Sequence, residues 1–425
     1  MMTFHIRNIR AVTLGIVLGS TGCIQVPEED DGQSDEDVAA AQQLLRSAAQ
    51  EQREFTIASQ PYADCELTST GSDHSVPVVA DGDGIVHLWA APSGAGQVFT
   101  LECNEPSGPA RYDFDLGDPA MFAPSASRAA SRSSAPSNDR WIRPPLSDPE
   151  SKSQSELTAA GYPPRPAPGT ERYQQWLEQA SRPITVIRPR VFNRGNRHKG
   201  PEIPDDNINW GTGLSLKAKG ARYTDVYSSF DVPTCIAKGS LSMADKWIGL
   251  GGSDGSKRLI QAGVECESID GVTYYSPWFE YYTHPTQYPG IAMGPGDQVY
   301  WEVWECSANG SYGPSSHGYG CFFWYNASRG TALFTQIVKI PSGTAFKGGS
   351  CDSVMESHLP DWEFSGWAGG TSIPFTCAAD GNFTTRDLST DRYENNTMVN
   401  DRGRTLGYAE ATEPNVATMF WRRSK

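Results

Sequence analysis

The sequence lacks several features that would assign it to common functional classes. Beyond the N-terminus of the 425-residue chain, no run of eighteen apolar residues occurs, so the sequence predicts no membrane-spanning helix. Basic residues are too few to balance the acidic ones: 35 lysines and arginines stand against 50 aspartates and glutamates, a net charge of −15. This charge argues against a nucleic-acid partner and is compatible with a soluble, acid-tolerant exported protein.

Motifs for metal and serine chemistry are also missing. The sequence has no CxxC and no HExxH, and its seven histidines are scattered, so we expect no metal and no cofactor. Residues 251–255 (GGSDG) match the GxSxG pattern of serine hydrolases, but that motif needs a helix after its turn. A second strand-like run follows here, so a hairpin turn explains these residues better than a nucleophilic Ser253 does.

The N-terminus is typical of an export signal. Arg7 and Arg10 precede an apolar stretch from Ala11 to Leu18, which small residues and then Cys23 follow. The small residues before the cysteine are similar to a bacterial lipoprotein signal, which implies lipidation of Cys23. We therefore expect an exported protein, either an outer-membrane or periplasmic lipoprotein or, in the alternative, a secreted chain that loses Cys23 with the signal.

Eight further cysteines, an even number, predict disulfides in an exported chain. Cys65 and Cys103 are alone in the N-terminal part, and Cys306 and Cys321 flank a Gly/Ser loop between two strand-like runs. We expect these two pairs. The remaining pairings stay open among Cys235, Cys266, Cys351 and Cys377.

Composition divides the chain into segments of different character. Residues 158–181 hold a proline-rich piece (YPPRPAP) and one predicted short helix (GTERYQQWLEQAS), with Thr170 as its cap. The basic run after the helix is either a solvated linker or a pro-segment held on an acidic domain. The expected segments are 1–23, export signal; 24–54, acidic linker; 55–116, small β-domain closed by its disulfide; 117–150, low-complexity linker; 151–204, leader and possible pro-segment; and 205–425, a large β-rich domain.

The sequence pattern of residues 205–425 predicts an all-β domain. Short strand-like runs recur every eight to twelve residues and are divided by Gly, Pro, Asn and Asp, and no long helical period appears. This pattern predicts an antiparallel β-sandwich, jelly-roll-like, or a barrel. About 220 residues are ample for one such core.

Several polar residues lie in apolar surroundings that suit catalysis. Gln261 interrupts the strand-like run RLIQAGVECES, and a buried amide costs a few kcal/mol unless its donors and its carbonyl are satisfied. Acids flanked by apolar residues can have a raised pKa and act as general acid or base. Such an acid is more often a sheet residue that points to solvent. The candidates are Glu280, Glu302, Glu305 and Glu356.

Six segments, in order, resemble the glutamic peptidases, or eqolisins, over about residues 207–425. They are NWG (209–211), YSSFDVP (227–233), WIGLGG leading to LIQAG (247–263), YYSPWFEYY (274–282), MGPGDQV (293–299) and SVMESHLP (353–360). The resemblance implies a β-sandwich endopeptidase active in acid, with a glutamine and a glutamate as its catalytic pair.

Carried over residue by residue, the resemblance implies Gln261 and Glu356 as the catalytic pair. It implies a substrate groove lined by Trp247, Trp278, Glu280 and Tyr282. One position departs from the family pattern: Gly251 stands where the family has an acidic residue, and nearby Asp254 is a possible substitute.

Two other classes of function remain open from the residues alone. An aromatic-rich β-sandwich also suits a non-catalytic carbohydrate- or peptide-binding module. A glycosidase would need a second carboxylate, Glu280 or Glu302, about 5 to 9 Å from Glu356 across a groove. We expect a protein or peptide substrate, a monomer, no nucleic acid, and membrane contact only through a lipid on Cys23.

Overall fold

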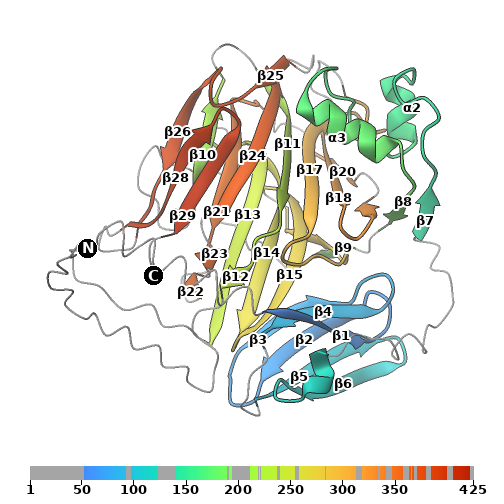
Figure 1. Ribbon diagram of the computed structural model, residues 1–425, viewed down its shortest axis with the longest axis vertical. Helices are drawn as coiled ribbons and strands as arrows, with labels where there is room; N and C mark the ends of the chain where they lie inside the picture. Colours follow the sequence, from blue (N-terminus) through green and yellow to red (C-terminus); the bar gives the residue numbers. More distant parts are fainter. Residues whose placement is uncertain are drawn as a thin grey trace, which may run out of the picture.

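Two large, mostly antiparallel sheets pack face to face, and a small β-domain lies at one end of them (Figure 1). This computed structural model confirms the all-β sandwich expected from the sequence. Among the described residues, no helix has the length and apolar character that a membrane span requires. The structure describes residues 52–91, 97–122, 140–188, 191–193, 211–218, 220, 222–236, 240–253, 258–282, 284–312, 318–333, 336–340, 347–357, 363–364, 366–367, 371–379, 384–399 and 405–421.

Sheet 1 runs in the order β1-β4-β15-β14-β13-β21-β10-β26, with β16 beside β15, β9 beside β16 and β22 beside β13. Its central strands β13, β14 and β15 are buried at every position, on both faces. The strands are β1 (Arg53–Ala58), β4 (Ile85–Ala90), β15 (Val272–Tyr281), β14 (Leu259–Ile269), β13 (Leu241–Gly251), β21 (Ser350–Glu356), β10 (Gly211–Lys217), β26 (Arg392–Asn396), β16 (Gln287–Pro289), β9 (Val191–Asn193) and β22 (Glu363–Phe364).

Sheet 2 runs in the order β27-β28-β29-β24-β11-β17-β18-β19-β8-β7, with β20 beside β18 and β25 beside β24. Its strands are β27 (Met398–Val399), β28 (Thr405–Glu413), β29 (Val416–Trp421), β24 (Thr371–Ala379), β11 (Tyr223–Asp231), β17 (Gln298–Cys306), β18 (Tyr319–Asn326), β19 (Thr331–Leu333), β8 (Ile184–Ile187), β7 (Arg140–Arg143), β20 (Gln336–Lys339) and β25 (Thr384–Arg386). A short separate pair consists of β12 (Cys235–Ile236) and β23 (Gly366–Trp367).

The main core fills the space between the inner faces of these two sheets. Alternate residues of each strand point inward, such as Ile248 and Val264 of sheet 1 and Phe322 of sheet 2. Phe230 and Trp301 meet edge to face with ring centroids 4.5 Å apart, a geometry that aromatic pairs prefer. Because these positions face inward, their sequence neighbours must face outward, and this alternation creates the two outer faces described below.

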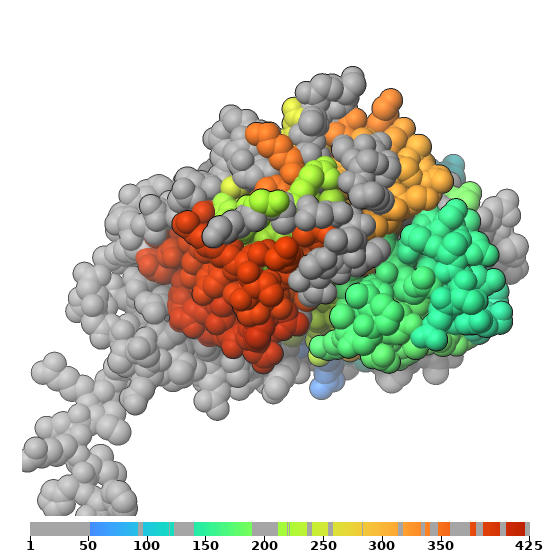
Figure 2. Space-filling model, turned by 90° about the horizontal axis from the view of Figure 1, so that it is seen from above, coloured from blue at the N-terminus to red at the C-terminus, as the bar shows by residue number. Residues whose placement is uncertain are grey.

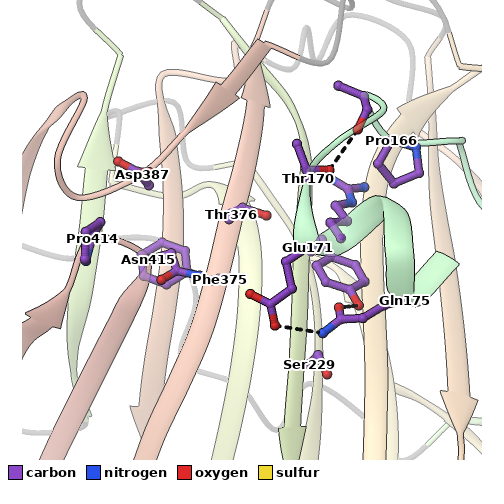
Figure 3. Close-up of a pocket in the computed structure, with 13 residues that line it drawn as sticks. Pro166, Thr170, Glu171, Gln175, Ser229, Phe375, Thr376, Asp387, Pro414 and Asn415 are labelled. Atoms are coloured by element: carbon purple, nitrogen blue, oxygen red, sulfur yellow. Dashed lines mark hydrogen bonds between the residues drawn. The ribbon is translucent and has the colours of Figure 1, made fainter.

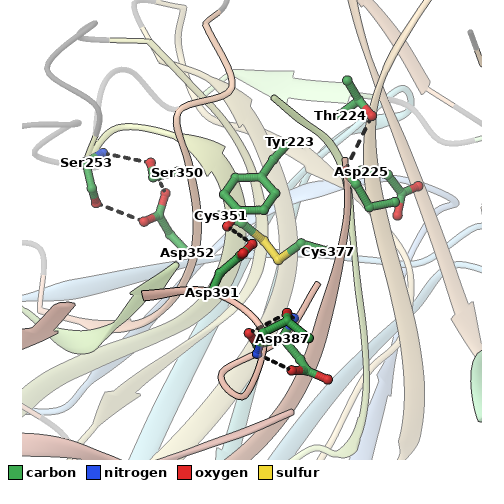
Figure 4. The surroundings of a disulfide bond; sticks show 12 residues. Tyr223, Thr224, Asp225, Ser253, Ser350, Cys351, Asp352, Cys377, Asp387 and Asp391 are labelled. Atoms are coloured by element: carbon green, nitrogen blue, oxygen red, sulfur yellow. Dashed lines mark hydrogen bonds between the residues drawn. A yellow bond between two sulfur atoms is a disulfide. The ribbon is translucent and has the colours of Figure 1, made fainter. Parts of the chain in front are cut away.

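Four disulfides are present among the described residues. Cys65–Cys103 and Cys306–Cys321 are the two pairs that the sequence suggests. The pairings that the sequence left open are Cys235–Cys266 and Cys351–Cys377. The last of these joins β21 of sheet 1 to β24 of sheet 2 and ties the two layers together (Figure 4). Such a set is typical of extracellular or exported proteins.

The small β-domain is docked on the sandwich rather than tethered to it. Sheet 3 consists of β3 (Ser75–Val79), β2 (Asp64–Ser69), β5 (Val98–Glu105) and β6 (Gly108–Asp115), and η1 (Pro119–Phe122) follows. Strands β1 and β4 of this domain extend sheet 1, where Trp89 pairs with Thr273 of β15. Its core also takes in Ile269, Val272 and Tyr274 from the sandwich. The two parts therefore share buried apolar surface.

Two helices, α2 (Gln154–Ala159) and α3 (Glu171–Ala180), cover the outer face of sheet 2, with α3 beside the C-terminal strands and α2 beyond α3 in Figure 2. The predicted cap is confirmed, because the Thr170 hydroxyl accepts a hydrogen bond from the backbone N–H of Tyr173 at 3.1 Å. The apolar face of α3, with Tyr173 and Trp176, is buried against Leu157 of α2.

A buried ion cluster fastens α3 to sheet 2. The Arg172 guanidinium, 10 % exposed, contacts Asp225 of β11 at 2.7 Å and Glu302 of β17, and both carboxylates are shielded from solvent. We expect Arg172→Ala to lower the free energy of unfolding by about 3–5 kcal/mol, because it leaves buried charges uncompensated. The matched control is Arg182→Ala, which removes a half-exposed pair with Glu178 and should cost at most about 0.5 kcal/mol. Thermal and urea unfolding of both variants measure the difference. Equal stability would contradict this role of Arg172.

Candidate active site

The outer face of sheet 1 gathers the polar residues of its central strands. Ala244 and Ile248 of β13 point into the core, so Asp245, Trp247 and Gly249 point outward. The antiparallel register then sets Glu356 of β21 opposite Asp245. It sets Gln261 of β14 opposite Gly249 on one side and Glu280 of β15 on the other.

Glu356 is held by an indole from the neighbouring strand. The Nε1–H of Trp247 donates to Oε2 of Glu356 at 2.9 Å, and the carboxylate is 1 % exposed. Trp247 lies on β13 midway between Asp245, which pairs with Glu356, and Gly249, which pairs with Gln261. The two predicted catalytic residues therefore lie on the same face, on strands that flank β13.

Gln261 is a buried amide with a fixed direction. Its Nε2 donates to Oε2 of Glu280 at 3.3 Å, and the Thr286 hydroxyl donates to the same oxygen at 3.2 Å. The Gln261 Oε1 has no hydrogen-bond partner among the described residues, although the side chain is 1 % exposed. Burial, and then the nearby Glu356 charge, raise the pKa of Glu280 to about 8. Glu280 is therefore neutral below that pH, and its Oε2 accepts the hydrogen bond that orients the Gln261 amide.

Two glycines make room for these side chains. A Cβ on Gly249 would lie 2.7 Å from Leu259 Cδ1 and 3.1 Å from Gln261 Cβ. A Cβ on Gly263 would lie 2.7 Å from the Trp278 ring, so the indole rests directly on the backbone there. A larger residue at either position would displace a predicted site residue.

A row of buried acids crosses this face, and two of its members, Asp245 and Glu265, were not predicted from the sequence. Asp245 stands between Glu265 of β14 and Glu356 of β21. The Nε1–H of Trp278 donates to Asp245 at 2.7 Å, and the Tyr288 hydroxyl donates to Glu265 at 2.7 Å. The available signal was spacing: Asp245 precedes Trp247 by two residues and therefore shares its face.

Gly251 stands where the resemblance led us to expect an acidic residue, and the possible substitute, Asp254, lies outside the described residues. Gly251 has φ +86°, a left-handed conformation that glycine adopts without strain. Near it, Asp352 accepts hydrogen bonds from Ser253 at 2.8 Å and from Ser350 at 3.1 Å (Figure 4). Burial raises the pKa of Asp352 to about 7. Ser253 thus belongs to the turn after β13, where its hydroxyl contacts a carboxyl and Ser215.

The remaining predicted residues divide between two faces. Trp278 and the partly buried Tyr282 belong to an apolar cluster with Trp247 on the outer face of sheet 1. Glu302 and Glu305 instead pair with Arg172 and Arg222 at sheet 2. Glu302 is therefore excluded as a partner of Glu356, because the two lie on different sheets. Cys23 lies outside the described residues.

A cavity of about 260 Å³ lies elsewhere, between α3 and sheet 2 (Figure 3). Its polar groups are engaged locally: Glu171 accepts a hydrogen bond from Gln175, and Asp387 accepts several from its own turn. It is on the face opposite to Gln261 and Glu356. In the part of the chain that the structure describes, no group of three or more His, Cys, Asp or Glu side chains is arranged to hold a metal ion.

Raised carboxyl pKa values make stability depend on pH. Asp352 and Glu280 keep their protons up to about pH 7 and about pH 8 in the folded protein, whereas unfolded carboxyls ionise near pH 4. Between these limits the folded state binds more protons than the unfolded state. Acidification therefore raises the free energy of unfolding, by up to about 1.4 kcal/mol per group per pH unit. The stabilisation is lost as pH rises through the folded-state pKa values.

We therefore expect the thermal unfolding midpoint to rise from pH 8 to pH 5. Circular dichroism melts at each pH measure this, with Glu280→Gln as the comparison, because the variant lacks one of the titrating carboxyls and should show a smaller slope. A midpoint that falls on acidification would contradict the assignment of these carboxyls as protonated.

Comparisons with known proteins give one family match and several similar solved structures. The profile of the Peptidase A4 family matches residues 209–400. One similar solved structure is scytalido-glutamic peptidase with a peptide-based transition-state analogue, at 14 % identity and a TM-score of 0.40, where the match covers 50 % of this chain and 98 % of that one. A second is SCP-B, an eqolisin-family peptidase in a complex with the tripeptide Ala-Ile-His, at 15 % identity and a TM-score of 0.38, where the match covers 50 % of this chain and 98 % of that one. A third is aspergilloglutamic peptidase from Aspergillus niger, at 20 % identity and a TM-score of 0.34, where the match covers 42 % of this chain and 99 % of that one. A search of curated proteins found no match.

Proposed function

Because residues 209–400 match the Peptidase A4 family, we propose that this protein is an exported endopeptidase that hydrolyses peptide bonds at acid pH through Gln261 and Glu356. The observation that carries the proposal is the placement of these two side chains. They lie on one face of sheet 1, on either side of Trp247, and each is held by a buried partner. The family match supports a peptidase as the class of activity.

The geometry suits activation of water by one carboxylate. Glu356, ionised, takes a proton from a water molecule that attacks the scissile carbonyl carbon. Gln261 has two amide hydrogens, and one of them donates to Glu280. The other is available for the developing oxyanion, and one such donor is worth about 3 kcal/mol. Glu356 then returns its proton to the leaving nitrogen, and this route needs no covalent intermediate.

Access for a substrate requires the site to open, because Gln261 and Glu356 are each only 1 % exposed. We propose that the protein is a zymogen in which residues 150–204, which include a basic run, bind the acidic domain near neutral pH. Protonation of carboxylates in acid weakens such contacts. Incubation at acid pH should then release a fragment that begins near residue 200, detected by N-terminal sequencing. Cleavage of a test substrate by an intact chain would refute the zymogen.

Export is the proposed location, with Cys23 as the lipidated residue. The N-terminal pattern and the four disulfides support it. Labelling of the wild-type chain, but not of Cys23→Ser, with a radioactive fatty acid tests lipidation.

Hydrolysis of an unstructured peptide, followed by mass spectrometry in the presence of EDTA, tests the proposed activity. We expect internal cleavage that the chelator does not affect, since no step uses a metal. Intact peptide at every pH, with the protein folded and its leader removed, would refute the proposal and favour a carbohydrate- or peptide-binding module.

One observation keeps a glycosidase as the second candidate. The residue opposite Glu356 is itself a carboxyl, Asp245, on the adjacent strand. Paired carboxyls about 5 Å apart serve retaining glycosidases. Assays on polysaccharides with the same preparation distinguish the two, because the peptidase proposal predicts no release of reducing sugar.

A further inference from the structure

Asp245 occupies the centre of a line of three carboxyl groups. Its position on β13 is directly opposite Glu356 on β21 and directly opposite Glu265 on β14. Neighbouring strands lie about 4.8 Å apart, and directly paired side chains are nearest neighbours on one face. All three side chains are at most 1 % exposed. Asp245 is therefore the one member with a carboxyl on each side.

The carboxyl groups that face Asp245 from the packed strands favour its neutral form. Glu356 approaches from β21, and Glu265 and, one step further, Glu267 approach from β14. The indole N–H of Trp278 of β15, which donates to Asp245, acts in the opposite direction and lowers its pKa. Burial first, and then the charges of Glu265 and Glu356, raise the pKa of Asp245 well above its usual range. Two buried carboxylates side by side cannot readily both be ionised.

We propose that Asp245 is a positioning residue that sets the upper pH limit of the reaction at Glu356. This inference rests on the proposed peptidase function. In acid, Asp245 is neutral and Glu356 acts as the general base. As pH rises, Asp245 ionises and places a second negative charge beside the site where the oxyanion develops. That charge opposes the transition state, so kcat falls although the base is present.

The experiment compares pH profiles of kcat and KM for a soluble internally quenched peptide. Asp245→Asn is nearly isosteric, keeps an oxygen for the Trp278 N–H and cannot ionise. We expect its falling limb to move upward by about one pH unit or more, with the rising limb unchanged. The matched control is Glu265→Gln, one strand further from Glu356. We expect its falling limb to move downward instead, because loss of the Glu265 charge lowers the pKa of Asp245. Asp245→Ser serves as a second non-ionising variant should the first not fold, and near-ultraviolet circular dichroism reports folding.

The outcomes separate this inference from the proposed function. If the activated wild type shows no acid activity, the proposed function fails. If the wild type is active and both Asp245 variants keep its falling limb, the inference fails alone. A folded variant that is inactive at every pH would also overturn it, because a neutral group at position 245 should support catalysis.

Discussion

Replacement of Glu356 with glutamine is expected to lower kcat/KM for peptide hydrolysis by about three orders of magnitude. The side chain keeps its shape, and its amide oxygen can still accept the Trp247 N–H that now reaches Oε2 of Glu356 at 2.9 Å. What is lost is the ability to take a proton from water and return it to the leaving nitrogen. The rate measurement uses an internally quenched peptide at the acid optimum.

The control for this prediction is an exposed glutamate. Glu410 lies at an exposed position of β28, so Glu410→Gln should leave both activity and unfolding temperature unchanged. Glu356→Gln should unfold at a temperature close to that of the wild type. If the folded Glu356→Gln variant retains more than about a tenth of the activity, Glu356 is not the general base.

Replacement of Gln261 with alanine is expected to lower kcat by about 10²–10³-fold, with a much smaller effect on KM. The amide donates to charge that exists in the transition state and is absent from the bound substrate, so its loss acts on kcat. The buried position is informative here, because the amide is fixed by Glu280, which also accepts from Thr286, and not by solvent. Single-turnover rates and KM, measured with the same peptide, separate the two effects.

Gln298→Ala is the matched control, since Gln298 is exposed at the start of β17 on the other sheet. It should behave as the wild type. A Gln261→Ala variant with unchanged kcat and raised KM would assign the amide to substrate binding instead of to the oxyanion.

Local patterns in the sequence predict the strands and one helix because short-range chemistry decides them. Residues 259–264 are an apolar run interrupted by Gln261 and form part of β14, and Thr170 caps α3 as its side-chain chemistry favours. The second helix, α2, was missed although its capping box is visible as Ser153 and Glu156 three residues apart. Six residues make too short a pattern to stand out by periodicity.

Contacts between distant strands could not be predicted, because register decides them. Nothing local to Asp245 indicates that it pairs with Glu356, 111 positions later in the chain. Arg172 gave no sign of its burial against Asp225. Lys246 is more extreme: alternation turns it into the sandwich, where its Nζ lies 3.7 Å from the centre of the Phe230 ring and burial lowers its pKa.

The most direct test of the central claim is cleavage of an unfolded protein by the purified chain from pH 2 to 7, with Glu356→Gln beside it. We expect cleavage that peaks in acid, once any leader is removed, and that disappears in the variant. Cleavage that peaks near neutral pH, or that the variant retains, would contradict a glutamine–glutamate peptidase. No cleavage at any pH by a folded, leader-free chain would contradict it as well and leave a binding module on a peptidase-like scaffold.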